Sequence, residues 1–143
     1  MNAVVFLTDK KFADNTKFMI KQVSRFDSDI PKYVLTDDSL ISSIDKDTWD
    51  LFSDNNTKII NSTNVLKSVG VQQADEGGWP PIVCARLLIP FLDQFSEYDK
   101  ILYLDSDISI LKDFRSIFDI DLQQHEVGAV EDFNQNNHAK KSI

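Results

Sequence analysis

The chain has 143 residues, of which 42% are hydrophobic and 27% are charged, and its formal net charge is −8. This length and composition predict a single globular domain with a sizeable core. The excess of acidic residues makes a nucleic-acid backbone or an anionic membrane surface an unexpected partner, because like charges repel unless a cation lies between them. Cys84 is the only cysteine, which excludes an internal disulfide and a zinc site built from cysteines.

Signals for a membrane or for export are missing from the sequence. No apolar run has the length of a transmembrane helix. Residues 3–7 read directly as a strand, without the basic region and apolar core that a signal peptide needs. We therefore expect a cytoplasmic location, which includes peripheral contact with the inner face of the membrane.

The first sixty residues predict strands and helices in alternation. Apolar residues between 12 and 26 recur at steps of four and three, which indicates one face of an amphipathic helix. Strands are predicted at 4–7, 33–35 and 59–60, and helices at 12–26 and 40–52. This β-α-β-α-β order favours a parallel sheet with right-handed crossovers, in the doubly wound manner.

The second half is less regular. Residues 61–81 are polar with one apolar patch and close in a Gly77–Pro81 turn, so we expect a functional loop there. A helix is predicted at 82–89, where Pro90 kinks or restarts it. Further on we expect an extended segment at 108–111, a helical turn or two at 114–118 and a last strand at 127–130, followed by a polar tail at 133–143.

The most informative stretch is the apolar run from Ile101 to Leu104. Its lack of polar alternation is typical of a strand buried on both faces, at the centre of a parallel sheet. Asp105 and Asp107 follow where this strand should end, at the edge where α/β sheets bind ligands. An Asp-x-Asp pair there can clamp a divalent ion that holds phosphates. The alternative is a polar turn that closes the strand.

Three predicted strands end in carboxylates, namely at Asp9, at Asp105 with Asp107, and at Asp132. In a parallel sheet these ends share one edge, so the acidic side chains should line a single crevice. Converging carboxylates without basic partners indicate a metal site or an acid–base site. Each carboxylate alone could instead cap the end of its strand.

Residues 85–90 (A-R-L-L-I-P) and 99–107 (D-K-I-L-Y-L-D-S-D) closely resemble the signature of the family 8 glycosyltransferases. These are retaining enzymes of the GT-A fold, including bacterial lipopolysaccharide galactosyl- and glucosyltransferases and glycogenin. Residues 4–9 and 127–132 match the family in order and spacing. The resemblance implies an α/β, GT-A-type, Rossmann-like and mostly parallel sheet flanked by helices. It also implies that residues 1–143 form one nucleotide-sugar-binding domain, truncated at the C-terminus relative to longer members.

The same resemblance assigns the metal and the catalytic residues. Asp105 and Asp107 would bind Mn²⁺ or Mg²⁺, which bridges the diphosphate of a UDP-sugar, and Ser106 would lie against the same donor. Arg86 would reach the donor sugar or its diphosphate, and it joins the two carboxylates as a catalytic residue. Its alternative is a helix-surface arginine in a salt bridge.

Further donor contacts follow from the resemblance. Asp9 would lie near the uracil and the ribose with Thr8 beside it, and Asp132 would approach the sugar hydroxyls. Phe12 occupies a position where the family often has an aromatic residue near the base, but its helical spacing predicts the core. His125 and His138 are the only histidines, and we expect both to be solvated rather than metal ligands.

The implied reaction is transfer of a hexose, with retention, from UDP-glucose or UDP-galactose to a hydroxyl of a glycan, glycolipid or protein acceptor. The C1–O bond would break towards an oxocarbenium-like state while the metal stabilises charge on the departing UDP. A nucleotide-sugar-binding or assembly module without turnover is the main alternative. A phosphatase with an Asp-x-Asp nucleophile is a minor one, because such a pair normally follows the first strand and runs into a small turn, whereas Asp107 precedes Ile108 late in the chain.

Overall fold

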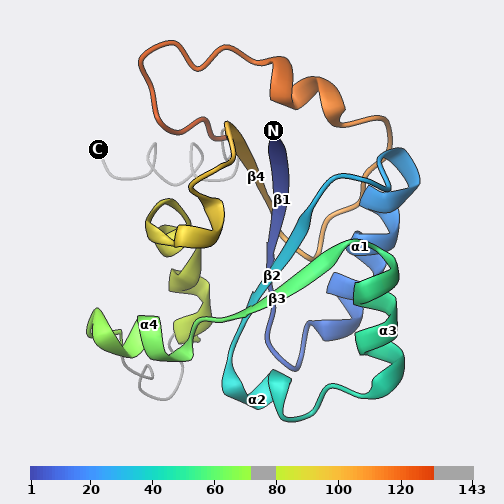
Figure 1. Cartoon of the computed structure of the whole chain (residues 1–143), viewed down its shortest axis with the longest axis vertical. Coiled ribbons are helices and arrows are strands. Elements are labelled where there is room, and N and C mark those ends of the chain that lie inside the picture. The colour runs from blue at the N-terminus through green and yellow to red at the C-terminus, as the bar shows by residue number, and fades with distance from the viewer. Residues whose placement is uncertain (72–79, 131–143) are drawn as a thin grey trace, which may run out of the picture.

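The computed structural model describes residues 1–71 and 80–130. A four-stranded sheet lies between two layers of helices (Figure 1). The strands are β1 (Asn2–Leu7), β2 (Lys32–Thr36), β3 (Thr57–Asn61) and β4 (Lys100–Leu104). The α-helices are α1 (Ala13–Phe26), α2 (Asp38–Ile41), α3 (Lys46–Asp54) and α4 (Thr63–Ser68). The 3₁₀ helices are η1 (Pro81–Phe91), η2 (Asp93–Phe95) and η3 (Arg115–Asp119).

All the strands of the sheet run parallel, in the order β3-β2-β1-β4. Phe6 of β1 lies opposite Val34 of β2 and opposite Leu104 of β4. The carboxyl ends of the strands therefore meet at one edge, which we call the carboxyl edge. The parallel α/β sheet predicted from the sequence is confirmed. The prediction that residues 101–104 form a central strand buried on both faces is wrong, because β4 has a neighbour on one side only in the described sheet and is half-buried along its length.

One face of the sheet packs against α1 and α3 (Figure 1). Val4 and Phe6 of β1 point to this face, because side chains of a strand alternate between its two sides. The apolar stripe of α1 meets them, and its buried members are Met19, Ile20 and Val23. Each fully buried side chain of this size contributes about 1.5–3 kcal/mol relative to exposure. This stripe is the face predicted for residues 12–26.

The opposite face packs against α4, η1 and η2 (Figure 1). It receives the alternate side chains of β1 and β2, and from the helices it receives Leu66, Ala85 and Ile89. The helix predicted at 82–89 is present as the 3₁₀ helix η1, which keeps Pro90 inside it and ends at Phe91. We refer to this side of the sheet as the η1 face.

The helix predicted at 40–52 is in fact two helices. Asp37 caps α2 by accepting from the backbone N–H of Leu40 at 3.0 Å, and Asp45 caps α3 by accepting from Thr48 at 2.8 Å. A residue that caps a helix start leaves the helical conformation itself, so the second cap divides the predicted segment. Within the loop predicted at 61–81, the described part contains α4.

The strand predicted at 127–130 is not formed. Val127 is 74% exposed and Val130 is 95% exposed. A strand gains its hydrogen bonds from a neighbour, and in the described sheet β4 pairs with β1 alone. The apolar residues of this segment therefore had no partner to bury them.

After β4 the chain crosses to the α1 side and turns back. Phe114 packs edge-on against Phe26 of α1, with ring centroids 6.3 Å apart. Lys100 at the start of β4 donates to the carbonyls of Phe118 at 2.7 Å and Ile120 at 2.6 Å. Thus η3 lies near the edge where β1 and β4 begin, away from the carboxyl edge (Figure 1). The turns predicted at 114–118 are confirmed by η3.

Several predicted features lie outside the described residues, namely the glycines of the Gly77–Pro81 turn, Asp132, His138 and the tail at 133–143. Among the residues that are described, no helix is both long and apolar enough to cross a bilayer.

Candidate functional site

Strand alternation places one of the predicted acidic residues on the η1 side of the carboxyl edge. Tyr103 of β4 packs against the core on the η1 face, and Asp105 follows it by two positions, directly after the end of the strand. A contact confirms this placement of Asp105, because the hydroxyl of Tyr103 donates to its carboxylate oxygen Oδ1. Asp9 lies past the end of β1, in the turn before α1, where alternation no longer fixes its direction.

Tyr103 connects the predicted catalytic residues. The guanidinium carbon of Arg86 lies 5.8 Å from the centroid of the Tyr103 ring, within cation–π range. Arg86 also donates from Nε to the carbonyl of Val83 at 3.0 Å, which fixes the base of its side chain on η1. None of the ion pairs in the described part of the chain includes Arg86, so the surface salt bridge considered as its alternative is not seen there.

The charges of this cluster act together on the Tyr103 hydroxyl. Burial raises the pKa of Tyr103, and its hydrogen bond and charge interaction with Asp105 raise that pKa further. The Arg86 guanidinium lowers the pKa and the charge of Asp107 raises it by smaller amounts. The phenol is therefore neutral at physiological pH and serves as a hydrogen-bond donor. The structure brings Arg86, Asp105 and Asp107 into electrostatic reach of one hydroxyl.

The sequence prediction missed Tyr103. Two signals were available, since Tyr103 is the polar-tipped residue of the apolar run and it precedes Asp105 by two positions on the same face. Tyr103 is half-buried, and a tyrosine whose ring packs against a core usually finds a partner for its hydroxyl. That partner here is the carboxylate at the end of the same strand.

Asp105 and Asp107 are exposed, and Ser106 between them is half-buried. Carboxylate oxygens are the hard ligands that Mg²⁺ and Mn²⁺ prefer. Among the described residues no group of three His, Cys, Asp or Glu side chains is arranged to hold a metal ion. A cation at this pair would need water and ligand phosphates to complete its shell, which is how Mg²⁺ commonly binds. The donor set therefore fits a cation that bridges protein and phosphate.

Asp9 caps the turn between β1 and α1. Its Oδ1 accepts from the backbone N–H groups of Lys11 at 2.8 Å and Phe12 at 3.0 Å. The capping role held as the alternative for Asp9 is thus present, and among the described residues its Oδ2 accepts no hydrogen bond. Phe12 is 38% exposed at the start of α1, so the core position predicted from its helical spacing is wrong.

A ladder of buried hydroxyl groups crosses the carboxyl edge. Ser62 donates from Oγ to the carbonyl of Thr36 at 2.8 Å, and Thr36 donates from Oγ1 to the carbonyl of Thr8 at 2.8 Å. Thr8 in turn donates from Oγ1 to the carbonyl of Asp9 at 3.1 Å. The carbonyls of Thr36 and Asp9 also accept backbone N–H groups, from Ser62 at 2.9 Å and Phe12 at 3.2 Å, whereas the Thr8 carbonyl lies just past the end of β1 and depends on the Thr36 hydroxyl. Thr8 is 3% exposed, so its hydroxyl serves the fold, and contact of Thr8 with a ligand stays a prediction.

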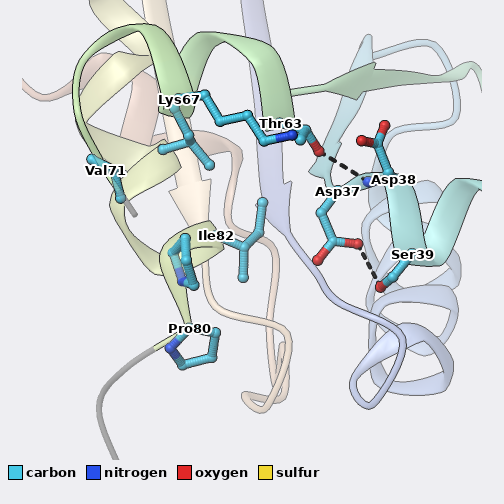
Figure 2. A pocket seen from close by; sticks show the side chains of 10 residues that line it. Asp37, Asp38, Ser39, Thr63, Lys67, Val71, Pro80 and Ile82 are labelled. Carbon is cyan, nitrogen blue, oxygen red and sulfur yellow. Dashed lines mark hydrogen bonds between the residues drawn. The ribbon is translucent and has the colours of Figure 1, made fainter. Parts of the chain in front are cut away.

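A cavity of about 580 Å³ opens at the β2 and β3 end of the same edge (Figure 2). Its walls are set by two local hydrogen bonds, from Ser39 Oγ to Asp37 at 2.8 Å and from the Asp38 N–H to Thr63 Oγ1 at 3.0 Å. The remaining lining is mainly apolar, from Leu66, Val71, Pro80, Pro81 and Ile82. The sheet order puts this cavity on the opposite side of β1 from β4. None of the predicted site residues that the structure describes lines it.

This arrangement, a parallel sheet with acidic side chains beyond the carboxyl ends of its strands, defines a Rossmann-like ligand-binding domain. Residues 3–143 match the family model described as glycosyl transferase family 8. The chain belongs to this family, as the resemblance in its sequence implied.

Relatives and solved structures agree with this assignment. Glycosyltransferase GlyF of Streptococcus pneumoniae serotype 4 is 27% identical over 133 residues, and GlyB of the same strain is 28% identical over 132 residues. Each alignment covers 91% of this chain and 31% of the relative. The chain thus spans about a third of their length.

Two solved structures share the fold. The galactosyltransferase LgtC, in complex with donor and acceptor sugar analogues, superposes with a TM-score of 0.64 at 21% identity, over 86% of this chain and 44% of LgtC. The bifunctional glycosyltransferase WbbM superposes with a TM-score of 0.69 at 24% identity, over 98% of this chain and 24% of WbbM. The expected GT-A fold is confirmed by these superpositions.

Proposed function

We propose that this chain forms the donor-binding part of a metal-dependent glycosyltransferase. The reaction moves a hexose, with retention, from UDP-glucose or UDP-galactose to a hydroxyl of a glycan, glycolipid or protein acceptor. The observation that carries the proposal is the cluster of Arg86, Tyr103 and Asp105 at the carboxyl end of β4, with Asp107 in the adjoining turn. This cluster supplies the guanidinium of Arg86 and the two exposed carboxylates of Asp105 and Asp107 at the edge where parallel sheets bind ligands.

Each residue has a role that its position allows. Asp105 and Asp107 would hold Mn²⁺ or Mg²⁺, and the ion would neutralise charge on the diphosphate as the C1–O bond breaks. Arg86 would add a second positive charge against the leaving group. Asp9 would offer its Oδ2 to the nucleoside, and Ser106 would lie against the diphosphate. The contact of Asp132 with the sugar hydroxyls stays a prediction.

The acceptor side is not assigned, since the chain spans 31% of the length of its relatives. A nucleotide-sugar-binding module without turnover uses the same donor site and is the second candidate. Positioning of the acceptor can lower a barrier by about 7–11 kcal/mol at best. We therefore expect these 143 residues to bind UDP-sugars weakly, to hydrolyse them slowly and to transfer little. The cytoplasmic location expected from the sequence also stays a prediction.

Calorimetry with UDP, with and without Mn²⁺, tests the donor site, and a product assay separates the two candidates. Asp107 is exposed, so Asp107→Asn should abolish Mn²⁺-dependent UDP binding and leave the thermal unfolding midpoint unchanged. Asp50→Asn on α3 is the matched control, because it removes one exposed negative charge on the other side of the sheet. Unchanged Mn²⁺-dependent binding in Asp107→Asn would remove the metal role. Binding without any product would favour the module.

A further inference from the structure

We propose that Tyr103 is a positioning residue that holds the carboxylate of Asp105 in the orientation a divalent cation needs. The inference rests on the proposed function, because it concerns the same metal site. It assigns Tyr103 a role that acts through the carboxylate of Asp105.

The position of Tyr103 suits this role. Its ring is packed against the core on the η1 face, and its pairing partner Val5 belongs to that core. Arg86 covers the ring from η1, with its guanidinium carbon 5.8 Å from the ring centroid. A side chain enclosed in this way has few rotamers, so its hydroxyl has a fixed place at the end of β4.

Asp105 has no such enclosure of its own. It is exposed, and the hydrogen bond from Tyr103 is the only contact that the described structure gives its side chain. Without that bond the carboxylate would rotate about its χ angles, and binding a cation would cost the entropy of ordering it. The bond comes from a neighbour two positions away on the same strand face, so it forms wherever β4 is folded.

The geometry also divides the carboxylate between two tasks. Tyr103 donates to Oδ1, which leaves Oδ2 to face a cation. A neutral phenol suits this use because it donates without adding a charge that would repel the metal. Groups that orient a metal ligand typically change metal affinity about 10–100-fold when they are removed. Asp107 has no equivalent partner among the described residues, so the effect should act through Asp105.

The test compares Tyr103→Phe with Tyr98→Phe in the 143-residue chain. Tyr103→Phe removes the hydroxyl and keeps the ring under Arg86. Tyr98→Phe removes another tyrosine hydroxyl, which bonds to Tyr33 at 2.9 Å within the protein and makes no contact with the acidic pair. Mn²⁺ binding is read directly by electron paramagnetic resonance of the free ion. We expect about tenfold weaker Mn²⁺ binding in Tyr103→Phe and no change in Tyr98→Phe.

A double-mutant cycle excludes a merely structural effect. In the Asp105→Ala background the Tyr103→Phe change should have no further effect on the Mn²⁺ affinity that Asp107 retains, because the acceptor of the bond is already gone. Should Tyr103→Phe fail to fold, the wild-type chain labelled with ¹³C at tyrosine Cζ gives a second measurement. The Tyr103 resonance should shift on addition of Mg²⁺, and the same shift should be missing in Asp105→Asn.

Three results would overturn the inference. Unchanged Mn²⁺ binding in Tyr103→Phe would mean that the hydroxyl is irrelevant. Tighter Mn²⁺ binding in Tyr103→Phe would mean that the hydroxyl competes with the cation. Equal losses in Tyr103→Phe and Tyr98→Phe would mean a general loss of stability. Failure of the proposed function has a different signature, since the wild-type chain would then bind no Mn²⁺ that depends on Asp107.

Discussion

The hydroxyl of Thr36 donates to the backbone carbonyl of Thr8 at 2.8 Å and so ties the end of β2 to the turn that carries Asp9. Both threonines are buried. Thr36→Val keeps the shape of the side chain but leaves the Thr8 carbonyl without this donor. An unsatisfied buried acceptor costs about 1–3 kcal/mol, so we expect a loss of that size in the free energy of unfolding, measured with urea.

The matched control is Thr57→Val on β3, where the hydroxyl donates to the backbone carbonyl of the half-buried Asn55 at 3.1 Å. That change should cost much less, because water can replace the lost donor. A similar loss in both variants would show that the ladder contributes no more than an ordinary surface contact.

Substitutions of Asp9 can separate its capping role from its proposed nucleoside contact. Asp9→Ala removes both, so it should destabilise the protein by about 0.5–1.5 kcal/mol through loss of the hydrogen bonds in the turn and weaken UDP-sugar binding by about 1–3 kcal/mol. Asp9→Asn keeps an acceptor for the N–H groups of Lys11 and Phe12 and should stay stable. Calorimetry and urea unfolding of both variants make the comparison.

Free Mn²⁺ binding should change little in either Asp9 variant. An equal loss of Mn²⁺ and UDP-sugar binding would instead mean that Asp9 supports the metal site.

Arg86→Lys keeps the positive charge of Arg86 but loses the planar group above Tyr103. A lysine ammonium cannot form the bidentate contacts that a guanidinium offers to phosphate. We expect UDP-sugar binding, measured by calorimetry, to weaken about tenfold, at a cost of about 1.4 kcal/mol. The thermal unfolding midpoint should not move, since Arg86 is exposed.

Arg25→Lys provides the control for that substitution. Arg25 lies over Phe26 with its guanidinium carbon 6.0 Å from the ring centroid, at the last turn of α1. The substitution repeats the exchange of a planar guanidinium over an aromatic ring for an ammonium, at a position without a role in the proposed donor site. If the wild-type chain and Arg86→Lys bind the UDP-sugar equally well, Arg86 is a surface residue of η1 and the bidentate contact with the donor is excluded.

Lys32 makes the stability of the fold depend on pH. Its side chain is fully buried at the start of β2, where Nζ donates to the carbonyl of Ile30 at 2.9 Å. Burial lowers the pKa of Lys32 below 10.5, although the charges of Asp27 and Asp29 raise it in part. Between the folded and unfolded pKa values the unfolded chain binds more protons, so stability rises with pH in this window.

Lys32→Met removes this titration. The free energy of unfolding of the wild-type chain minus that of Lys32→Met should increase from neutral pH towards pH 10.5, by up to about 1.4 kcal/mol per pH unit within the window. The contribution is lost as the pH falls through the folded pKa. Urea unfolding at several pH values provides the measurement. A difference that falls with pH would contradict the assignment.

Much of the fold could be predicted because local patterns decide it. The apolar run of β1 and the apolar stripe on α1 depend on burial alone, and both are found where they were expected. The division of the helix predicted at 40–52 was not predicted, because the apolar spacing continues across Asp45, whose side chain caps α3. The strand at 127–130 failed for a different reason, since a strand needs a neighbour that a local pattern does not contain.

The site divides in the same way. The sequence motif could single out Arg86 and the Asp105–Asp107 pair as candidates, because their spacing is fixed along the chain, and their roles stay predictions. The contact between Arg86 and Tyr103 depends on how η1 packs over β4, which no spacing encodes. The sequence analysis also missed the ladder of buried hydroxyl groups, because its members come from three separate strand ends.

The outer side of β4 has a consequence for how the isolated chain behaves in solution. In the part of the chain that the structure describes, β4 forms its ladder with β1 alone, so one row of backbone donors and acceptors there faces outward. Such an edge is a template for another strand and promotes self-association as concentration rises. The same strand leads into the turn of Asp105 and Asp107. Whatever backbone completes this edge therefore also stiffens the segment that presents the two carboxylates, and assembly and ligand affinity should rise together.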